Sequence, residues 1–266
     1  MKHFLVIACA IWLGFDAGAQ TNAPSASSTP PTNSPAAGHP AKLPEPLSTT
    51  TPDNTRYLND PQLLTDCTAR LAAMSDKPCD IIFIGDSITA AWLGEGKTVW
   101  EKSYAPRHAL DFGIGGDKTQ NVLWRLNNMD LQNLKPKVAV VLIGTNNTMN
   151  TPHEIANGVK AVLANTQEAF PGVKIILVSI MPNARAEDKM MQADSLIKSY
   201  ADDSTVYYLD LVPLMPEVTT ASPDAGTTDT NWKGLGPDRL HPDTSGYQIW
   251  ADAMEPLLTK LLTGGT

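Results

Sequence analysis

The sequence has few cysteines, no excess of basic residues and no apolar run long enough to span a bilayer. It carries a formal net charge of −8, with no basic stripe to neutralise phosphates, and this argues against a nucleic-acid partner. No Cys/His cluster has the spacing of a zinc site, and we expect no metal and no cofactor. What is present is an ordinary globular composition, 42% hydrophobic and 18% charged over 266 residues, enough for one substantial domain.

The amino terminus has the features of an export signal. A basic start, Met1-Lys2-His3, precedes an apolar run from Phe4 to Phe15. This run is shorter than the roughly 20 residues that a transmembrane helix needs. Small residues at Ala17-Gly18-Ala19 suit a signal peptidase. We therefore predict a cleaved signal peptide over residues 1–19, with the mature protein secreted or periplasmic, and no stable insertion in a membrane. A lipoprotein site at Cys9 is disfavoured because too little apolar sequence precedes it.

Residues 20–52 are rich in Pro, Ser, Thr and Ala and contain almost no large apolar side chain. Such a segment cannot bury enough surface to offset the entropy lost on ordering, so it predicts a disordered tether. The folded domain is then expected over residues 53–264. Removal of the signal leaves Cys67 and Cys79, which could form one disulfide or remain two buried thiols.

Past the tether, apolar β-rich runs alternate with helical patterns. Strands are expected near 81–84, 108–112, 138–143, 174–179 and 206–209, and helices near 57–74, 117–126, 152–170, 188–200 and from 247 onward, with a further helical segment carrying Trp92 and Trp100. This alternation predicts a three-layer α/β/α sandwich with a five-stranded parallel sheet. The stretch from Val212 to Pro237 is predicted to be a long irregular loop, and loops of that length are usually functional.

The run from Asp80 to Thr89 organises the prediction of function. Its β-branched residues read as a buried parallel strand that stops at Gly85, where a side chain would obstruct the turn. Ser87 would then stand at the carboxyl end of the strand, where open α/β sheets bind ligands. Taken alone, Ser87 could equally be a simple helix N-cap.

Three further segments decide between these interpretations. Glycine-bearing turns at 113–117 and 144–147 follow the next two strands, and Asp238-Arg239-Leu240-His241 precedes the last helix. Singly, an Asp-x-x-His pair is most often a solvated loop, a Gly-Gly pair only a turn, and Asn146 only a cap. Together and in this order they predict a serine hydrolase site. Ser87 is the candidate nucleophile, His241 its base and Asp238 the residue that orients the base. The backbone N–H groups of Ser87 and Gly116 and the Asn146 amide are candidate oxyanion donors.

These segments resemble the four blocks of the SGNH, or GDSL, hydrolase family. Residues 84–89 match the nucleophile block, and residues 111–117, 143–147 and 238–242 are similar to the glycine, asparagine and histidine blocks of the platelet-activating-factor acetylhydrolase catalytic subunits. The resemblance implies a flavodoxin-like SGNH fold and the same five catalytic and oxyanion residues. It departs from the pattern at Asp111, where that subgroup usually has Asn, and at Asn147, where much of the family has Asp.

The export signal and the resemblance together imply an exported, metal-independent ester hydrolase that forms an acyl-enzyme. We expect an acetylesterase acting on short acyl esters of carbohydrates, with a small-molecule or glycan ester as its substrate partner. Two alternatives are a lysophospholipase or acetylhydrolase acting on lipids, and a glycan-binding protein without catalysis. Trp232 is either a sugar-stacking residue or a packing residue. The sequence gives no prediction of the oligomeric state.

A phosphate-binding loop at residues 94–98 and a dinucleotide fingerprint at residues 113–118 are both excluded. Ala91 occupies the first glycine position that a phosphate loop requires, and Lys118 replaces the last glycine of the fingerprint. Ser87 also lies outside a Gly-x-Ser-x-Gly elbow, which disfavours an α/β-hydrolase.

Overall fold

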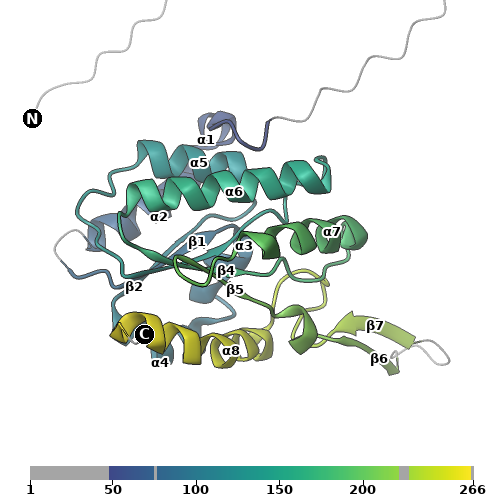
Figure 1. The fold of residues 1–266 in the computed structure, drawn as a ribbon. Coiled ribbons are helices and arrows are strands. Elements are labelled where there is room, and N and C mark those ends of the chain that lie inside the picture. Colours follow the sequence, from purple (N-terminus) through teal and green to yellow (C-terminus); the bar gives the residue numbers. More distant parts are fainter. Residues whose placement is uncertain (1–47, 75–76, 222–227, 265–266) are drawn as a thin grey trace, which may run out of the picture. The chain divides into compact units, whose positions relative to one another are not determined.

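A parallel sheet forms the centre of the folded part of the chain (Figure 1). The computed structural model describes residues 48–74, 77–221 and 228–264, so the predicted signal peptide and most of the predicted tether lie outside the described residues. The sheet has the strand order β2-β1-β3-β4-β5, and every pairing in it is parallel. The strands are β1 (Ile81–Gly85), β2 (Ala109–Gly113), β3 (Val138–Leu142), β4 (Lys174–Val178) and β5 (Val206–Leu209). The predicted five-stranded sheet is confirmed.

The register of the three strands β2, β1 and β3 brings their carboxyl ends level with one another. Gly85 at the end of β1 pairs with Gly113 of β2 on one side and with Leu142 of β3 on the other. The strand order also reverses at β1: the chain runs from β1 to β2 on one side and then crosses back from β2 to β3 on the other. In open α/β sheets a ligand crevice forms outside the carboxyl ends at such a point. The three predicted site turns all begin there.

Helices cover both faces of the sheet (Figure 1). Alternate residues of β1 point to opposite layers: Ile82 and Ile84 pack into one apolar core, while Ile81 and Phe83 pack into the other. This alternation follows from the two-residue period of a strand. The first core is closed by α1 (Thr55–Asn59), α2 (Gln62–Met74), α5 (Thr119–Asn128), α6 (Pro152–Ala169) and α7 (Glu187–Ile197), and the second by α3 (Ser87–Ala90), α4 (Lys97–Ser103) and α8 (Thr244–Thr263).

Aromatic side chains fill the second core beneath the nucleophile strand. The ring of Trp92, fully buried, lies 5.8 Å from Phe83 of β1 and 4.5 Å from Tyr247 of α8, measured between ring centroids. Such tilted aromatic pairs contribute about 0.5–1.5 kcal/mol each beyond the apolar area they bury. This packing fixes α8, and therefore the loop before it, against the strand that carries Ser87.

The helix predicted over 57–74 is wrong in one respect, because it is two helices. α1 ends at Asn59 and α2 begins at Gln62, with Asp60-Pro61 between them. Asp60 has φ −142° and ψ 83°, outside the helical region. Proline lacks the N–H of a helix interior and forces the residue before it away from helical ψ. The break turns α1 toward the glycine-rich turn after β2.

The stretch from Val212 to Pro237 is not wholly irregular, which corrects the prediction. It contains an antiparallel hairpin of β6 (Glu217–Ala221) and β7 (Thr228–Trp232). The alternation in Val218-Thr219-Thr220 is short and polar, so it lacks the apolar period that identifies a buried strand. Trp232 at the end of β7 is buried in the second core and stacks under Arg239, 5.3 Å from its ring centroid. Packing is therefore the role that its position supports.

The end of the predicted tether belongs to the domain. Thr49 is buried, its hydroxyl donates to the Glu154 carbonyl oxygen at 2.7 Å, and its own carbonyl oxygen accepts from the Thr119 hydroxyl at 2.9 Å. Gly158 on α6 makes room for it, since a Cβ there would lie 2.8 Å from the Thr49 Cβ. Backbone groups buried in this way need partners, and Thr49 finds them on two helices.

The two cysteines of the domain remain separate. Cys67 on α2 and Cys79 before β1 are both buried and both free. Burial raises the pKa of the Cys79 thiol to about 12, so it stays protonated and unreactive at neutral pH. Of the two alternatives left open by the sequence, the structure has the pair of buried thiols.

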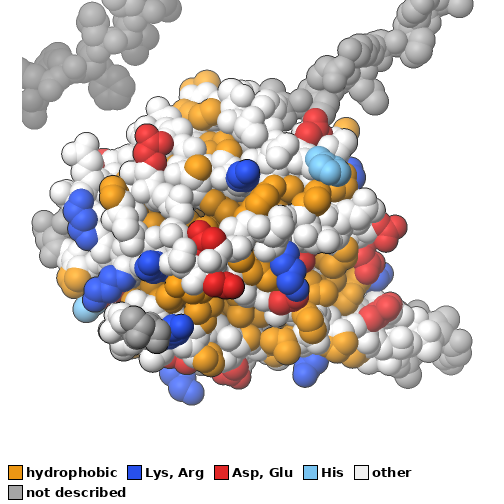
Figure 2. All heavy atoms as spheres, in the orientation of Figure 1, with side chains coloured by type: hydrophobic (Ala, Val, Ile, Leu, Met, Phe, Trp, Pro, Cys, Tyr) orange, Lys and Arg blue, Asp and Glu red, His pale blue; other side chains and the backbone are white. Residues whose placement is uncertain are grey.

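Charged side chains of both signs are interspersed on the face shown in Figure 2, and neither forms a large separate patch there. Among residues 48–74, 77–221 and 228–264, no helix is both long enough and apolar enough to span a membrane. In the same residues no group of three or more His, Cys, Asp and Glu side chains is placed to hold a metal ion.

Candidate active site

Ser87 is the first residue of α3, at the turn that leaves β1. Asp86 caps this helix, because its Oδ1 accepts a 2.9 Å hydrogen bond from the Ile88 N–H. Gly85 is required by close approach: a Cβ at this position would lie 2.1 Å from the Thr89 hydroxyl and 2.3 Å from the Leu142 carbonyl oxygen. The absence of a side chain at Gly85 thus allows the strand to turn sharply and present Ser87 at its tip.

His241 and Asp238 reach this turn from the other end of the chain. His241 Nε2 lies 2.8 Å from the Ser87 Oγ, and His241 Nδ1 lies 2.5 Å from the Asp238 Oδ2. Asp238 Oδ1 also accepts hydrogen bonds from the His241 and Leu240 N–H groups, at 3.0 and 3.1 Å. Burial raises the pKa of Asp238, but these hydrogen bonds lower it by more. The pKa therefore lies below its usual range, and the carboxyl is ionised. The three side chains form one continuous hydrogen-bonded chain.

The loop that carries His241 is held by its own backbone. The Gly236 N–H donates to the His241 carbonyl oxygen at 2.8 Å, and the Arg239 N–H donates to the Gly236 carbonyl oxygen at 3.0 Å. Arg239 adopts a left-handed conformation with φ 55°, which is uncommon for a residue with a side chain and costs energy. A strained residue between Asp238 and His241 is maintained because the surrounding hydrogen bonds fix the turn.

Gly116 lies in the turn after β2, also with a positive φ of 76°. Its N–H has no acceptor within the described part of the chain, so it is available to a ligand. A Cβ at Gly116 would lie 2.9 Å from the Arg56 guanidinium, which shows that Arg56 of α1 covers this turn. The Arg56 Nη1 is itself anchored by a 2.9 Å ion pair with Asp117 Oδ1. A glycine here satisfies both the backbone conformation and the close approach of Arg56.

A buried network fixes the turn from below. Asp117 Oδ2 accepts from the Arg125 Nε at 2.9 Å and from the Tyr57 hydroxyl at 2.7 Å. Arg125, fully buried, also donates to the carbonyl oxygens of Phe112 at 2.7 Å and Gly85 at 3.2 Å. One guanidinium therefore ties the ends of β1 and β2 together. Every polar contact of this buried charge goes to an oxygen, as burial of a charge requires.

Asn146 follows β3 and points back across the ends of the strands. Its Nδ2 donates to the Asp117 carbonyl oxygen at 3.0 Å and to Asp86 Oδ2 at 3.3 Å, while its Oδ1 accepts from Arg185 Nη1 at 3.1 Å. These three contacts fix which way the amide faces. An oxyanion that binds to Asn146 therefore competes with the long contact to Asp86 for one amide N–H.

Asp86 is the titratable group at the centre of the site. It is completely buried, and burial raises its pKa to about 7. The hydrogen bond from Ile88 opposes this rise, and the negative charge of Asp117 reinforces it.

Asn147, one of the two departures from the family pattern, is also buried and accepts from the Thr119 N–H at 3.1 Å through its Oδ1. Its position supports the start of α5 and does not reach Ser87.

Comparison with known proteins identifies the family. The sequence profile described as the GDSL-like lipase/acylhydrolase family matches residues 83–249. The platelet-activating factor acetylhydrolase IB subunit alpha2 of Homo sapiens is 36% identical over 190 residues, covering 70% of this chain and 79% of that protein. The alpha1 subunit of Bos taurus is 32% identical over 200 residues, covering 73% and 81%. The chain belongs to the GDSL-like lipase/acylhydrolase family.

Solved structures support the fold of this GDSL-family chain. A protein from Bacteroides fragilis proposed to be an acylhydrolase aligns over 79% of this chain and 99% of its own length, with a TM-score of 0.57 and 20% identity. A mutant acetyl esterase crystallised with an acetate ion aligns over 71% and 100%, with a TM-score of 0.50 and 19% identity. At these identities the likeness establishes the three-layer fold. An ester hydrolase is the activity that membership of the family supports.

Sequence reasoning missed the arginines of this GDSL-family site. Arg56 and Arg185 lie outside the four blocks, in segments whose sequence gives no sign that they approach Gly116 and Asn146. Arg125 follows the glycine block within the apolar run Val122-Leu123-Trp124-Arg125-Leu126, and a charge in such a run was the signal that could have identified its ion pair with Asp117. All five predicted site residues lie at the carboxyl ends of the strands or in the loop facing them.

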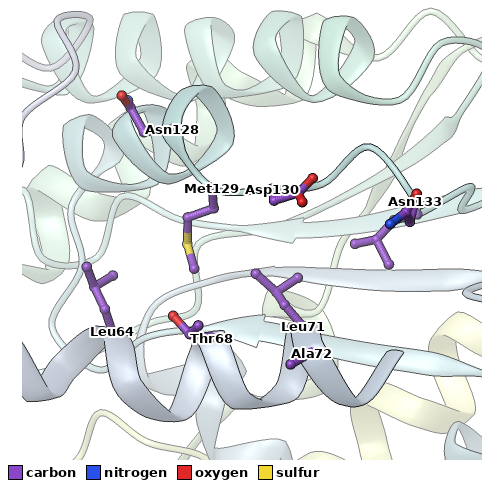
Figure 3. Close-up of a pocket in the computed structure, with 9 residues that line it drawn as sticks. Leu64, Thr68, Leu71, Ala72, Asn128, Met129, Asp130 and Asn133 are labelled. Atoms are coloured by element: carbon purple, nitrogen blue, oxygen red, sulfur yellow. The ribbon is translucent and has the colours of Figure 1, made fainter. Parts of the chain in front are cut away.

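A separate cavity of about 390 Å³ lies between α2 and the residues that follow α5 (Figure 3). Leu64 and Leu71 of α2 face Met129 across it, and the residues after α5 that line it lead into the amino end of β3. No predicted site residue is among the described residues that line it.

Proposed function

We propose that this chain is an exported serine ester hydrolase that removes short acyl groups, acetyl above all, from carbohydrates. The observation that carries the proposal is the continuous hydrogen-bonded chain from Ser87 through His241 to Asp238, with distances of 2.8 and 2.5 Å. A serine hydroxyl is a weak nucleophile until an adjacent base takes its proton, and this geometry supplies the base and its orienting carboxylate.

Acylation begins when the Ser87 Oγ attacks the ester carbonyl carbon. His241 Nε2 takes the hydroxyl proton, and the ionised Asp238 stabilises the imidazolium through Nδ1. Collapse of the tetrahedral intermediate expels the alcohol, which receives the proton from His241. Water then attacks the acyl-enzyme with His241 again acting as the base, and the acid leaves.

The developing oxyanion is stabilised by the N–H groups of Ser87 and Gly116 and by the Asn146 amide. The Gly116 N–H is free of other acceptors in the described part of the chain. Removing one such donor typically lowers kcat by about 100- to 1000-fold. Because every step uses groups of the protein and water, we expect activity to survive treatment with EDTA.

Two substrate classes remain in competition. The curated relatives are named as acetylhydrolases of platelet-activating factor, which favours a lipid acetyl ester. The predicted export signal over 1–19 and the Pro/Ser/Thr-rich segment after it favour an extracellular polymer, and the acetyl esterase with the same fold favours a small acyl group. Acetyl transfer is common to both classes, and we place the carbohydrate ester first.

The decisive experiment measures both the acyl and the alcohol preference of the purified protein. Hydrolysis of 4-nitrophenyl esters from acetate to decanoate gives the acyl preference, and release of acetate from acetylated xylan is compared with release from an acetylated lysophospholipid. We expect the highest kcat/KM on acetate and on acetylated xylan. A rate that rises steadily toward long acyl chains, or acetate released only from the lipid, would establish the lipid alternative.

Chemical labelling separates an enzyme from a glycan-binding protein that keeps the fold. A fluorophosphonate probe labels an activated serine, so wild-type protein should be labelled and the Ser87→Ala variant should not. Absence of labelling in the wild type would show that the site is inactive.

Export is tested separately, by expressing the full chain in bacteria and following the mature protein in the periplasmic and culture fractions. Mass spectrometry of that protein identifies its first residue.

A further inference from the structure

A second cavity, of about 250 Å³, opens beside the nucleophile turn. It lies between α2 and the turn after β2, and we name it the α2 cavity. Asp60, Gln62 and Asp66 stand on its α2 side, with Leu63 between them in sequence. Ala90 and the backbone of residues 113–115 form the opposite side.

The α2 cavity shares a wall with the nucleophile. Gly115 lines it, and a Cβ added to Gly115 would lie 3.8 Å from the Ser87 Cβ. Ala90 also lines it, and it is the last residue of α3, the one-turn helix that Ser87 begins. Ser87 itself is half-buried and not closed over. A group attached to an ester at Ser87 can therefore extend along Gly115 into this cavity.

The two carboxylates of the α2 cavity are free hydrogen-bond acceptors. Asp60 and Asp66 are exposed, and neither carboxylate has a hydrogen-bond or ion-pair partner in the described part of the chain. Arg70, the cavity's cation, is already engaged: its Nε donates to the Asp111 carbonyl oxygen at 2.8 Å and its Nη2 to the Gly113 carbonyl oxygen at 2.7 Å. What the cavity offers a ligand is two carboxylates and one amide side chain.

An apolar surface completes the lining. Ile114 is buried and Leu63 is half-buried, and both contribute to the wall. A pyranose ring presents hydroxyl groups at its edge and C–H groups on its face, and ionised acceptors form strong hydrogen bonds with hydroxyl donors. A phosphate group would instead meet two carboxylates against one guanidinium, that of Arg70, so the net charge of the lining is negative and repels it. The lining therefore suits a neutral polyol better than an anionic phosphate group.

We propose that the α2 cavity binds the leaving group of the ester, and that this group is a single sugar unit held by Asp60 and Asp66. The proposal rests on the function proposed above and deepens it by naming the alcohol. The volume agrees with this assignment, because it is slightly below the roughly 300–1,000 Å³ of sites for drug-sized ligands and leaves room for about one ring. The acyl group would then lie on the other side of Ser87.

The test compares two acetate esters that differ only in their alcohol. Acetylated xylobiose carries a sugar, and 4-nitrophenyl acetate carries an apolar phenol. In the double variant Asp60→Ala/Asp66→Ala, the ratio of kcat/KM for the sugar ester to kcat/KM for the phenyl ester should fall about tenfold or more, mainly through KM, as expected for losing one or two charge-assisted hydrogen bonds. Glu168→Ala removes an exposed carboxylate on α6 and serves as the matched control, for which the ratio should not change.

Each outcome separates this inference from the proposed function. If wild type hydrolyses both esters and the double variant keeps the same ratio, the cavity is not the sugar site although the esterase stands. If wild type hydrolyses 4-nitrophenyl acetate and no sugar ester, the sugar assignment fails and the serine mechanism remains. Binding without turnover is measured by calorimetry of acetylated xylobiose with Ser87→Ala protein. Loss of that binding in the Ser87→Ala/Asp66→Ala variant supports the cavity even if no hydrolysis occurs, and unchanged binding overturns it.

Discussion

The Tyr247 hydroxyl donates a 2.7 Å hydrogen bond to the Ile88 carbonyl oxygen, across 159 residues of sequence. Ile88 directly follows Ser87, and Tyr247 stands in the first turns of α8, just after the His241 loop. Both groups are buried. This hydrogen bond therefore sets the position of α8, which follows His241, relative to α3, which begins with Ser87. By itself it contributes about 0.5–1.5 kcal/mol to the stability of the fold.

Tyr247→Phe should lower both stability and kcat. The ring and its packing on Trp92 are kept, while the Ile88 carbonyl oxygen loses its hydroxyl partner. Leaving this buried acceptor without its partner costs more than the net contribution of the bond, about 1–3 kcal/mol, and each kcal/mol lowers the Tm by roughly 2–4 °C in a domain of this size. We expect kcat on 4-nitrophenyl acetate to fall several-fold with little change in KM, because the Ser87–His241 alignment loosens.

Tyr104→Phe is the matched control for that variant. The Tyr104 hydroxyl is also buried in the second core, but it has no hydrogen-bond partner in the described part of the chain. Removing it should leave kcat unchanged and should not lower the Tm. Differential scanning calorimetry and initial rates on both variants make the comparison. Equal kcat values for wild type and Tyr247→Phe would show that the bond supports the fold alone.

Alanine substitutions at the three residues of the hydrogen-bonded chain should lower kcat by different amounts. Ser87→Ala and His241→Ala remove the nucleophile and the base, and should each reduce kcat by more than about 10⁴-fold. Asp238→Ala should retain more activity than His241→Ala, because the base is still present and only its orientation and charge stabilisation are lost. Single-turnover kinetics on 4-nitrophenyl acetate measure all three. If Asp238→Ala reacted at the same rate as wild type, Asp238 would have no part in the mechanism.

Arg185 should act by positioning Asn146. Its guanidinium donates to the Asn146 Oδ1 at 3.1 Å, which turns the amide N–H groups toward the strand ends. We expect Arg185→Ala to lower kcat about tenfold, less than the roughly 100- to 1000-fold loss for Asn146→Ala, and to leave the Tm unchanged because Arg185 is exposed. Arg185→Lys should recover part of the rate. A change in KM with constant kcat would instead assign Arg185 to substrate binding.

The sequence was sufficient for the parts of the site whose geometry follows from local rules. The apolar run ending at Gly85 predicts a strand, and Ser87 after it predicts a helix start, because both signals lie within a few residues of each other. The position of His241 was inferred from the order of the four segments and from the resemblance to a family, since nothing local indicates that it approaches Ser87. Thr49 was assigned to the tether for the same reason: its neighbours in sequence are polar, while its partners are more than 60 residues away.

The residues that sequence reasoning did not find depend on side-chain contacts between distant elements. Arg56 reaches Gly116 because the predicted helix breaks at Asp60-Pro61 and α1 lies against the turn after β2. The acceptors Asp60 and Asp66 line a cavity only because α2 packs along β2. Propensity and periodicity describe an element by itself, so they do not contain this information.

Asp111 gives a prediction of pH dependence. Its carboxyl is buried beneath the turn after β2, where Oδ1 accepts from the Gly113 N–H at 2.7 Å and Oδ2 has no partner in the described part of the chain. Burial raises its pKa to about 7, whereas in the unfolded chain it is about 3.9. Between these values the folded protein binds more protons than the unfolded chain, so this group makes stability fall as the pH rises from about 4 to about 7.

Asp111→Asn should remove that contribution. The amide oxygen can still accept from Gly113, and the side chain no longer ionises. We therefore expect the difference in Tm between variant and wild type to become more positive as the pH is raised from about 5 to about 8. Part of the wild-type decrease should persist in the variant, because the buried Asp86 also has a pKa raised to about 7. Calorimetric scans of both proteins across this range measure the effect. A Tm difference that is the same at every pH would mean that Asp111 does not change its charge in the folded protein within this range.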